Sequence, residues 1–499
     1  MRTPGRRALL LGLALLGVAL LAAVLVRGWV SDDAFITLRA VRRVLAGQGP
    51  TWNPGDRVQV FTHPLWAALL VPAHALVGSG WWAALGLGLV TTGLFVAGIA
   101  SRATTGAAVA LALLLGSRSF VDFSTSGLEN PLLHVLVAAL VLWPRASEPR
   151  VAGLLAGAAL LTRLDTAPLV LLLLAGRLAR GQRLRGAGWA AALPLSWCGV
   201  SLFWFGALLP NPALAKLGAA LPKAEVIAQG ITWLGTSASM DPVGAVLLVA
   251  GLITCIARRE LRWAGAGILA HVAWIAWAGG DFMVGRFITP ALAVSAAALA
   301  GTRLRASLAL PAVVAALAAA VVPGGTLRWP DSREIADAGR LIDRDGLVDE
   351  RRYYTPGSAL LGWRPGRSMP QHAFRTRGER AADRDVITPV AVGITGYFAP
   401  PGVFLVDRTG VTDPFLARLP ARPGSRRPGH LYRDPPFGYQ EWIADPTCAL
   451  REVALVGLCD DVRLATRAPL LAPGRAAAVG RLLVGDVIQV LTGRRPTAE

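Results

Sequence analysis

Residues 8–30 read ALLLGLALLGVALLAAVLVRGWV, and Ser31-Asp32-Asp33 follows them directly. A helix of about 20 apolar residues is long enough to cross a lipid bilayer, so this run predicts a first membrane span. Arginines precede the run, and no clear small-x-small cleavage site follows it. We therefore expect an uncleaved first helix with a cytoplasmic N-terminus, and Asp32 and Asp33 at the mouth of the membrane on the opposite side.

Apolar residues fill nearly all of residues 1–323, and charged residues concentrate in residues 324–499. The chain is 54% hydrophobic and 16% charged, whereas a soluble domain carries about 25% charged residues. The split predicts a polytopic α-helical membrane module, followed by a small extracytoplasmic soluble domain. About 11 transmembrane helices are expected, at residues 8–30, 81–100, 103–117, 130–144, 151–163, 165–178, 187–208, 242–257, 263–279, 286–300 and 303–323.

One apolar segment, residues 64–78, is short for a span and contains Pro72 and His74. If it crossed the membrane, the arginine clusters of the later loops would face outward, against the positive-inside rule. We expect it to lie on the outer surface, as an interfacial helix of a first outer loop that covers residues 31–80. This arrangement makes the arginine-rich loops cytoplasmic and places residues 324–499 outside.

The sequence of residues 324–499 predicts a small α+β domain with little regular structure. Residues 390–397 and 403–406 have the pattern of strands separated by a turn. Residues 335–345 have the pattern of a short helix, and residues 476–492 that of a closing helix or strand pair. Outside the cytoplasm, Cys448 and Cys459 could form a disulfide.

Composition and residue spacing argue against nucleic-acid binding, ion transport and a zinc site. The net charge of +19 could attract nucleic acid, but membrane topology already explains many of the arginines, so no nucleic-acid partner is expected. Transport of ions usually needs ionisable groups inside the spans. Here the predicted spans are nearly free of acids, and His134 and His271 are more typical of packing residues. No cysteine or histidine cluster has the spacing of a zinc site.

The outer loops instead carry charges of both signs close to apolar helix ends, where ionisable residues are costly and usually functional. These candidate substrate-binding residues are His63, Glu129, Arg163, Asp165, Lys216, Asp281 and Arg286. Each also has a structural alternative. Arg163 could pair with Asp165, Asp281 could pair with Arg286, Glu129 could cap a helix, and Lys216 could anchor at the interface.

Group transfer from a lipid-linked donor fits acids and bases at an outer membrane surface. A carboxylate such as Asp32 or Asp33 could remove the proton of a sugar hydroxyl. Arg163, Lys216 and Arg286 could hold the departing lipid phosphate. Adjacent carboxylates could instead bind a divalent cation such as Mg²⁺ or Ca²⁺. The structural alternative for the acidic pair is an N-cap of the helix that follows it.

These residues stand in motifs whose order is specific, although each motif alone is weak. The motifs are Ser31-Asp-Asp-Ala-Phe-Ile-Thr-Leu-Arg39, Gly47-Gln-Gly49, Trp52-Asn-Pro-Gly55, Arg57-Val58, Thr62-His-Pro-Leu-Trp66, Ser126-Gly-Leu-Glu-Asn130, Thr162-Arg-Leu-Asp165, Leu209-Pro-Asn-Pro212 with Lys216, Gly279-Gly-Asp-Phe-Met283 with Arg286-Phe287, Gly396-Tyr397, Val406-Asp-Arg408 and Asp413-Pro414. The set resembles the bacterial membrane glycosyltransferases of the GT-C type. Within them it is most similar to the terminal arabinofuranosyltransferases of mycobacterial cell-wall synthesis and their relatives in other bacteria.

The resemblance implies a polyprenyl-phosphate sugar as donor, a cell-envelope glycan as acceptor, and transfer on the outer face of the bacterial plasma membrane. It implies a catalytic carboxylate in the first outer loop, with Asp32 favoured over Asp33. Thr62-His63-Pro64 departs from the pattern of the arabinosyl members. The resemblance implies that the sugar is arabinofuranose, and because of this departure another sugar such as mannose is the alternative. A non-enzymatic envelope assembly protein that binds a lipid-linked sugar is the remaining alternative.

Overall fold

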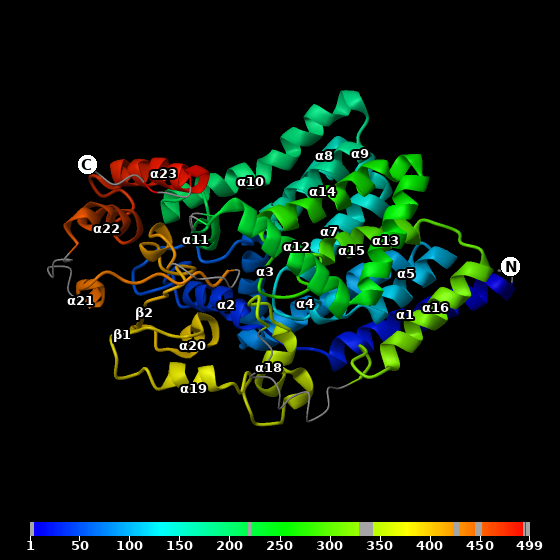
Figure 1. Ribbon diagram of the computed structural model, residues 1–499, viewed down its shortest axis with the longest axis horizontal. Helices are drawn as coiled ribbons and strands as arrows, with labels where there is room; N and C mark the ends of the chain where they lie inside the picture. The colour runs from blue at the N-terminus through cyan, green and yellow to red at the C-terminus, as the bar shows by residue number, and fades with distance from the viewer. Residues whose placement is uncertain are drawn as a thin grey trace. The chain divides into compact units, whose positions relative to one another are not determined.

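The computed structural model describes residues 4–217, 221–328, 343–422, 429–444, 452–492 and 495. Most of them are helical (Figure 1). The chain divides into two compact units, and each consists of three stretches of sequence. The first unit comprises Met1–Ser31, Trp81–Pro194 and Val226–Pro370, and the second comprises Asp32–Gly80, Leu195–Glu225 and Gln371–Glu499.

The first unit is a bundle of apolar helices. Its main helices are α1 (Pro4–Val26), α4 (Gly80–Ala100), α5 (Thr105–Gly116), α6 (Arg118–Asp122), α7 (Asn130–Leu142), α8 (Pro149–Thr162), α9 (Ala167–Arg177), the first half of α10 (Arg183–Phe205), α12 (Lys223–Met240), α13 (Pro242–Ala257), α14 (Arg262–Ala278), α15 (Thr289–Ala300), α16 (Ala306–Val321) and α18 (Glu350–Ser358). Short 3₁₀ turns connect some of them, at Pro144–Ser147, Leu164–Thr166, Arg180–Gln182, Arg259–Leu261 and Leu360–Gly362.

Helix α15 forms the centre of this bundle, because every one of its residues is buried. It packs against α5, α7 and α13. Small residues allow the close approach: a side chain at Gly251 of α13 would overlap Ser295 of α15, and one at Gly106 of α5 would overlap the Leu299 carbonyl oxygen. Small residues at such contacts are typical of helices packed within membranes.

Every predicted span forms a helix, and the segment 64–78 forms the separate helix α3 (Pro64–Val77). By length and composition, three helices of the described chain can cross a membrane, namely Gly5–Val26, Gly80–Ala100 and Arg183–Phe205. A fourth candidate is the pair α12 and α13, which is bent by 106°. The other apolar helices have 10–17 residues. The structure therefore supports a membrane protein, while the count of about 11 spans stays a prediction.

The second unit contains α2 (Asp32–Leu45), α3, the second half of α10, α11 (Asn211–Leu217), α19 (Ala373–Glu379), α20 (Val392–Phe398), a 3₁₀ turn at Leu416–Arg418, α21 (Tyr439–Ala444), α22 (Val453–Thr466) and α23 (Arg475–Thr492). Its described strands are β1 (Val386–Ile387) and β2 (Phe404–Leu405), which pair in parallel. The first outer loop thus packs with residues from the C-terminal part. The boundary predicted between residues 323 and 324 separates membrane-spanning residues from extracytoplasmic ones. The division into two packed units does not test it, so it stays a prediction.

Some predictions for the C-terminal part are corrected here. Residues 390–397 were expected to form a strand, but Val392–Phe398 is helical, because side chains from α2 bind both ends of this segment. The strand expected at residues 403–406 is limited to Phe404–Leu405. The closing helix at residues 476–492 is confirmed as α23.

Two further predictions fall partly or wholly outside the described residues. The helix expected at residues 335–345 lies mostly among residues 329–342, which are outside them. Cys448 is also outside them, so its disulfide with Cys459 stays a prediction. Cys459 itself is buried in a hydrophobic cluster formed by α21, α22 and α23 with β2 and the segment that follows β2.

Candidate functional site

Asp32 is the first residue of α2, and its carboxylate lies at the N-terminus of another helix, α20. The backbone N–H of Gly393 donates to Oδ2 at 2.9 Å, and that of Ile394 donates to Oδ1 at 2.7 Å. The whole residue is only 6% exposed. Asp32 thus caps α20, while the N-cap expected for α2 itself stays a prediction.

The sequence allows this contact because residue 393 is glycine. A Cβ atom at Gly393 would overlap the carbonyl oxygen of Asp32 and crowd its carboxylate. The other end of the segment is held by arginines of α2. Arg39 donates to the Gly396 carbonyl oxygen, and Arg42 donates to that of Ala399 at 3.1 Å. The acid at the N-terminus and the arginines at the C-terminus complement the dipole of α20.

The Asp32 carboxylate is poised to exchange a proton near neutral pH. Burial raises the pKa of Asp32 to about 7, and the negative charge of Asp33 adds to this effect, while the N–H groups of Ile394 and Gly393 oppose it. A carboxylate in water has a pKa of about 4. Asp32 is thus largely ionised above neutrality, yet more basic than an ordinary aspartate.

The second unit also contains Asp33, His63 and Lys216. Asp33 is half-buried in the first turn of α2. His63 occupies the N-cap position of α3, and its Nε2 lies 2.8 Å from Thr37 Oγ1. Thr37 is one helical turn beyond Asp33, so His63 contacts the face of α2 that carries Asp33. Lys216 is exposed on α11.

In the first unit, the five other predicted site residues come together in one network, in which all side chains except the half-buried Asp165 are buried. Glu129 precedes α7, Arg163 and Asp165 lie in the turn after α8, and Asp281 and Arg286 lie between α14 and α15. Oε1 of Glu129 accepts from Arg163 at 3.1 Å and from Arg286 at 3.2 Å. Arg163 also binds both oxygens of Asp165, and Arg286 lies 3.5 Å from Asp281.

The contacts in this network test the structural roles that were the alternatives to substrate binding for these residues. The pairs of Arg163 with Asp165 and of Arg286 with Asp281 both exist. Glu129 stands at the N-cap position of α7 but makes no side-chain cap. Counted over these five side chains, three acids face two arginines, which leaves one surplus negative charge. The network therefore offers both hydrogen-bond acceptors and charged donors, as sugar hydroxyl groups require.

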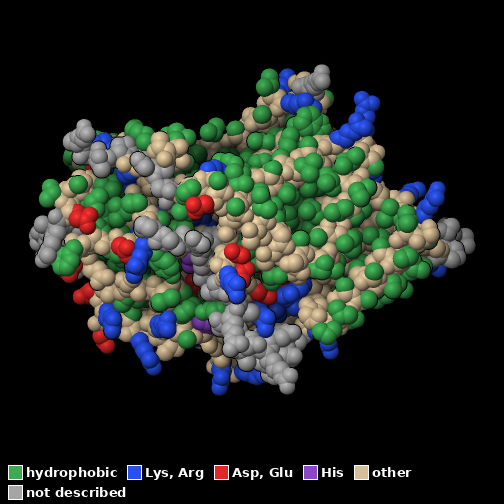
Figure 2. Space-filling view, viewed as in Figure 1, with side chains coloured by type: hydrophobic (Ala, Val, Ile, Leu, Met, Phe, Trp, Pro, Cys, Tyr) green, Lys and Arg blue, Asp and Glu red, His purple; other side chains and the backbone are tan. Residues whose placement is uncertain are grey.

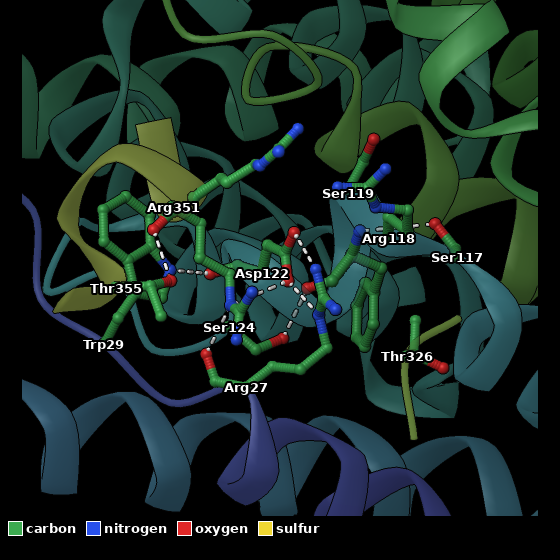
Figure 3. Close-up of polar contacts among 12 residues, drawn as sticks. Arg27, Trp29, Ser117, Arg118, Ser119, Asp122, Ser124, Thr326, Arg351 and Thr355 are labelled. Carbon is green, nitrogen blue, oxygen red and sulfur yellow. Dashed lines mark hydrogen bonds and ion pairs between the residues drawn. The ribbon is translucent and has the colours of Figure 1, made fainter. Parts of the chain in front are cut away.

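A second buried cluster in the first unit was not predicted. Arg27, at the end of the first apolar run, donates to both oxygens of Asp122, at 2.5 and 2.9 Å (Figure 3). Arg351 of α18 lies 3.4 Å from the same carboxylate. The Nε of Arg351 donates to the backbone carbonyl oxygen of Arg27 at 2.9 Å. The ring N–H of Trp29 donates to the backbone carbonyl oxygen of Asp122 at 2.7 Å. The sequence signals were a single arginine near the end of an apolar run and an acid, Asp122, in a predicted outer loop.

The electrostatics of this cluster are opposite to those around Asp32. Burial alone would raise the pKa of Asp122, but the charges of Arg27 and Arg351 outweigh burial and hold it below the usual value. Counted over these three side chains, two arginines face one acid, so one positive charge is in surplus. Asp122 is therefore an anion at neutral pH that holds arginines in place, rather than a proton acceptor.

The divalent cation expected at Asp32 and Asp33 stays a prediction. Both carboxylate oxygens of Asp32 accept backbone N–H groups, and each keeps capacity for one further partner. Mg²⁺ and Ca²⁺ take six or more oxygen ligands, of which water can supply several. Within the described residues, no group of three or more histidine, cysteine, aspartate or glutamate side chains could hold a metal ion.

Comparison with known proteins confirms the resemblance found in the motifs. The chain is 26% identical over 407 residues to the terminal β-(1→2)-arabinofuranosyltransferase of Mycobacterium tuberculosis, a match that covers 66% of this chain and 62% of that protein. It is 30% identical over 327 residues to the protein of the same name from Corynebacterium glutamicum, over 52% of this chain and 46% of that protein. The chain thus spans about half to three fifths of the length of these relatives.

No protein-family model matches the chain, and no solved structure is significantly similar to it.

Proposed function

We propose that the chain is a multi-pass glycosyltransferase of the GT-C type in the bacterial plasma membrane. It transfers a sugar from a polyprenyl-phosphate donor to a hydroxyl group of a cell-envelope glycan, on the outer face of the membrane. Arabinofuranose is the proposed sugar, because both relatives are named for its transfer. The observation that carries the proposal is the buried carboxylate of Asp32, with its pKa of about 7, in a chain similar to these transferases.

In the proposed reaction, the acceptor hydroxyl gives its proton to Asp32 while its oxygen bonds to the anomeric carbon. The bond between that carbon and the phosphate oxygen breaks, and the polyprenyl phosphate leaves with the electron pair. Each carboxylate oxygen of Asp32 accepts one backbone N–H and keeps capacity for another hydrogen bond. Asp33 acts through its charge, which raises the proton affinity of Asp32. The mechanism assigns no step to a metal ion.

The other candidate residues are proposed to bind the substrates. Glu129, Asp165 and Asp281 offer acceptors to sugar hydroxyl groups, while Arg163 and Arg286 offer charged donors to hydroxyl or phosphate oxygens. His63 and Lys216 are proposed to contact the donor or the acceptor. Support for the network comes from its burial and its mixed charge, since such groups are costly close to apolar helices unless they serve a function.

The proposed topology has about 11 spans, a cytoplasmic N-terminus, and residues 324–499 outside the cytoplasm. It is supported by the helices found at every predicted span and by the arginines in the loops assigned to the cytoplasm. A topology reporter fused after Val322 should give an extracytoplasmic signal. A cytoplasmic signal would mean that α3 crosses the membrane.

The direct experiment reconstitutes the purified protein in liposomes with a radiolabelled polyprenyl-phosphate arabinofuranose and an oligosaccharide acceptor. Mass spectrometry of the lipid that copurifies with the protein identifies the natural donor. Transfer of arabinose supports the full proposal, and transfer of another sugar corrects the donor alone. If a polyprenyl-phosphate sugar copurifies but is never transferred, the enzyme proposal fails and the lipid-binding assembly protein replaces it.

A further inference from the structure

Helix α23 carries apolar side chains on its exposed face as well as on its buried face. The buried face combines Ala478 and Leu482 with Arg475, Asp486 and Gln489. The exposed face carries Ala476, Ala477, Gly480, Val484, Val487 and Leu491, together with Arg481 and Thr492. A surface helix of a soluble protein usually has polar residues on its outer face.

The buried polar residues are bound within the second unit. Arg418 donates to both oxygens of Asp486, at 2.9 and 2.6 Å, and Arg495 binds the same carboxylate at 2.6 Å. Gln489 donates to the Ala417 carbonyl oxygen at 3.4 Å. These contacts fix the rotation of α23 about its axis, so its apolar face is held outward.

The outward face remains exposed. Val484, Val487 and Leu491 are 62%, 52% and 79% exposed. They repeat at the spacing of helical turns, so they form one continuous stripe. The flanking Arg481 is already paired with Asp461, at 2.9 and 2.5 Å, so the stripe has no unpaired charge at this flank. Figure 2 shows that the largest gathering of exposed hydrophobic side chains lies over the helix bundle of the first unit.

The beginning of α23 is tied to the end of a candidate membrane span. The Trp204 carbonyl oxygen, near the end of α10, accepts from Arg57 at 3.1 Å and from Arg475 at 3.3 Å. The same two arginines bind the Ala465 carbonyl oxygen of α22, at 3.4 and 3.1 Å. Helix α10 is long and apolar enough to cross a membrane, and only 17% of its most apolar stretch is buried.

We propose that α23 lies in the surface of the lipid bilayer, with Val484, Val487 and Leu491 inserted between the headgroups and the acyl chains. A bilayer is the occupant that fits, because the stripe is apolar and the exposed charge beside it, Arg481, is paired with Asp461. In addition, α23 begins at the end of a helix that is long and apolar enough to cross a membrane. Interfacial helices insert an apolar face in this way. The C-terminal residues then form a membrane-bound part rather than a freely soluble domain. The leaflet depends on the proposed topology, but the insertion does not depend on sugar transfer.

The test uses the full chain in nanodiscs of phosphatidylcholine and phosphatidylglycerol. The four native cysteines are replaced by serine, and a single cysteine is introduced as Val487→Cys or, as the control, Ala382→Cys. Ala382 is exposed in a charged turn of the same unit. Each cysteine carries an environment-sensitive fluorophore. A doxyl quencher on the lipid should remove most of the emission at position 487 and little at position 382, whereas aqueous iodide should do the reverse.

Strong quenching by iodide at position 487 would overturn the proposal, because the stripe would then face water. Resistance to both quenchers would also overturn it, because protein would then cover the stripe, and native mass spectrometry would show whether a second copy does so. A second measurement needs no mutation. A photoactivatable lipid should label the wild-type peptides of both α10 and α23, and labelling of α10 without α23 would contradict the insertion.

Discussion

Asp32 and Asp122 are both buried aspartates, but their partners differ. Asp32 accepts two backbone N–H groups, and its neighbour in sequence is another acid. Asp122 is bound by Arg27 and approached by Arg351. Burial acts on both carboxyl groups, yet the pKa is raised to about 7 at Asp32 and lowered at Asp122. Partner charge, rather than burial, thus separates a proton acceptor from a structural anion.

The largest expected effect is that of Asp32→Asn on sugar transfer. The amide cannot accept the hydroxyl proton, and loss of a general base typically lowers rates by about 10²–10⁴-fold. The measurement is the initial rate in liposomes, normalised to monodisperse protein. Full activity of this variant would remove Asp32 from the mechanism.

Asp122→Asn should act on stability instead. It leaves Arg27 and Arg351 buried without their anion, and breaking a buried ion pair from one side costs about 3–5 kcal/mol. Unfolding in detergent should show this loss, while the rate per folded molecule stays within a few-fold of wild type. The double variant Arg27→Gln with Asp122→Asn should recover part of the stability. A rate loss as large as that of Asp32→Asn would mean that the two acids do not differ in role.

Gly393→Ala tests the contact that holds Asp32. The added methyl group overlaps the Asp32 backbone and crowds its carboxylate, and overpacking of this kind costs about 1–3 kcal/mol. Transfer should fall together with stability, because the carboxylate is displaced. Gly402→Ala is the matched control, since a Cβ at Gly402 meets no atom within 4 Å. Equal behaviour of the two variants would show that the Gly393 contact does not position Asp32.

The pH dependence of transfer should report the Asp32 carboxyl group. With a pKa of about 7, its basic form declines below neutrality, so the rate should fall about tenfold per pH unit there. The same group is expected to lower stability as pH rises from about 4 to 7, because the folded state binds its proton more tightly than the unfolded state. Asp122 acts in the opposite sense, and its contribution to stability is lost only at acidic pH. A rate independent of pH between 5 and 8 would contradict the assignment.

Sequence patterns predicted the apolar helices well, because the signal lies within each segment. They also selected Glu129, Arg163, Asp165, Asp281 and Arg286, because charges beside apolar helix ends are unusual, and these five do meet. The same reasoning mistook α20 for a strand, because its β-branched residues have strand propensity. The helix instead depends on Asp32 and Arg39, which are far away in sequence.

The cluster of Arg27, Asp122 and Arg351 could not be predicted for a similar reason. Its members come from three segments that the fold alone brings together. An arginine at the end of an apolar run is a weak signal by itself, since many such residues serve topology. The exposed apolar stripe of α23 was hidden too, because sequence shows the faces of a helix but not which one is buried.

The most direct test of the central claim is the pH profile of single-turnover transfer in wild type and in Asp33→Asn. The charge of Asp33 raises the pKa of Asp32, so its removal should shift the acidic limb of the profile to lower pH and leave the rate at high pH within a few-fold of wild type. An unchanged limb, or a loss of transfer at every pH in Asp33→Asn while Asp32→Asn remains active, would show that Asp32 is not the base.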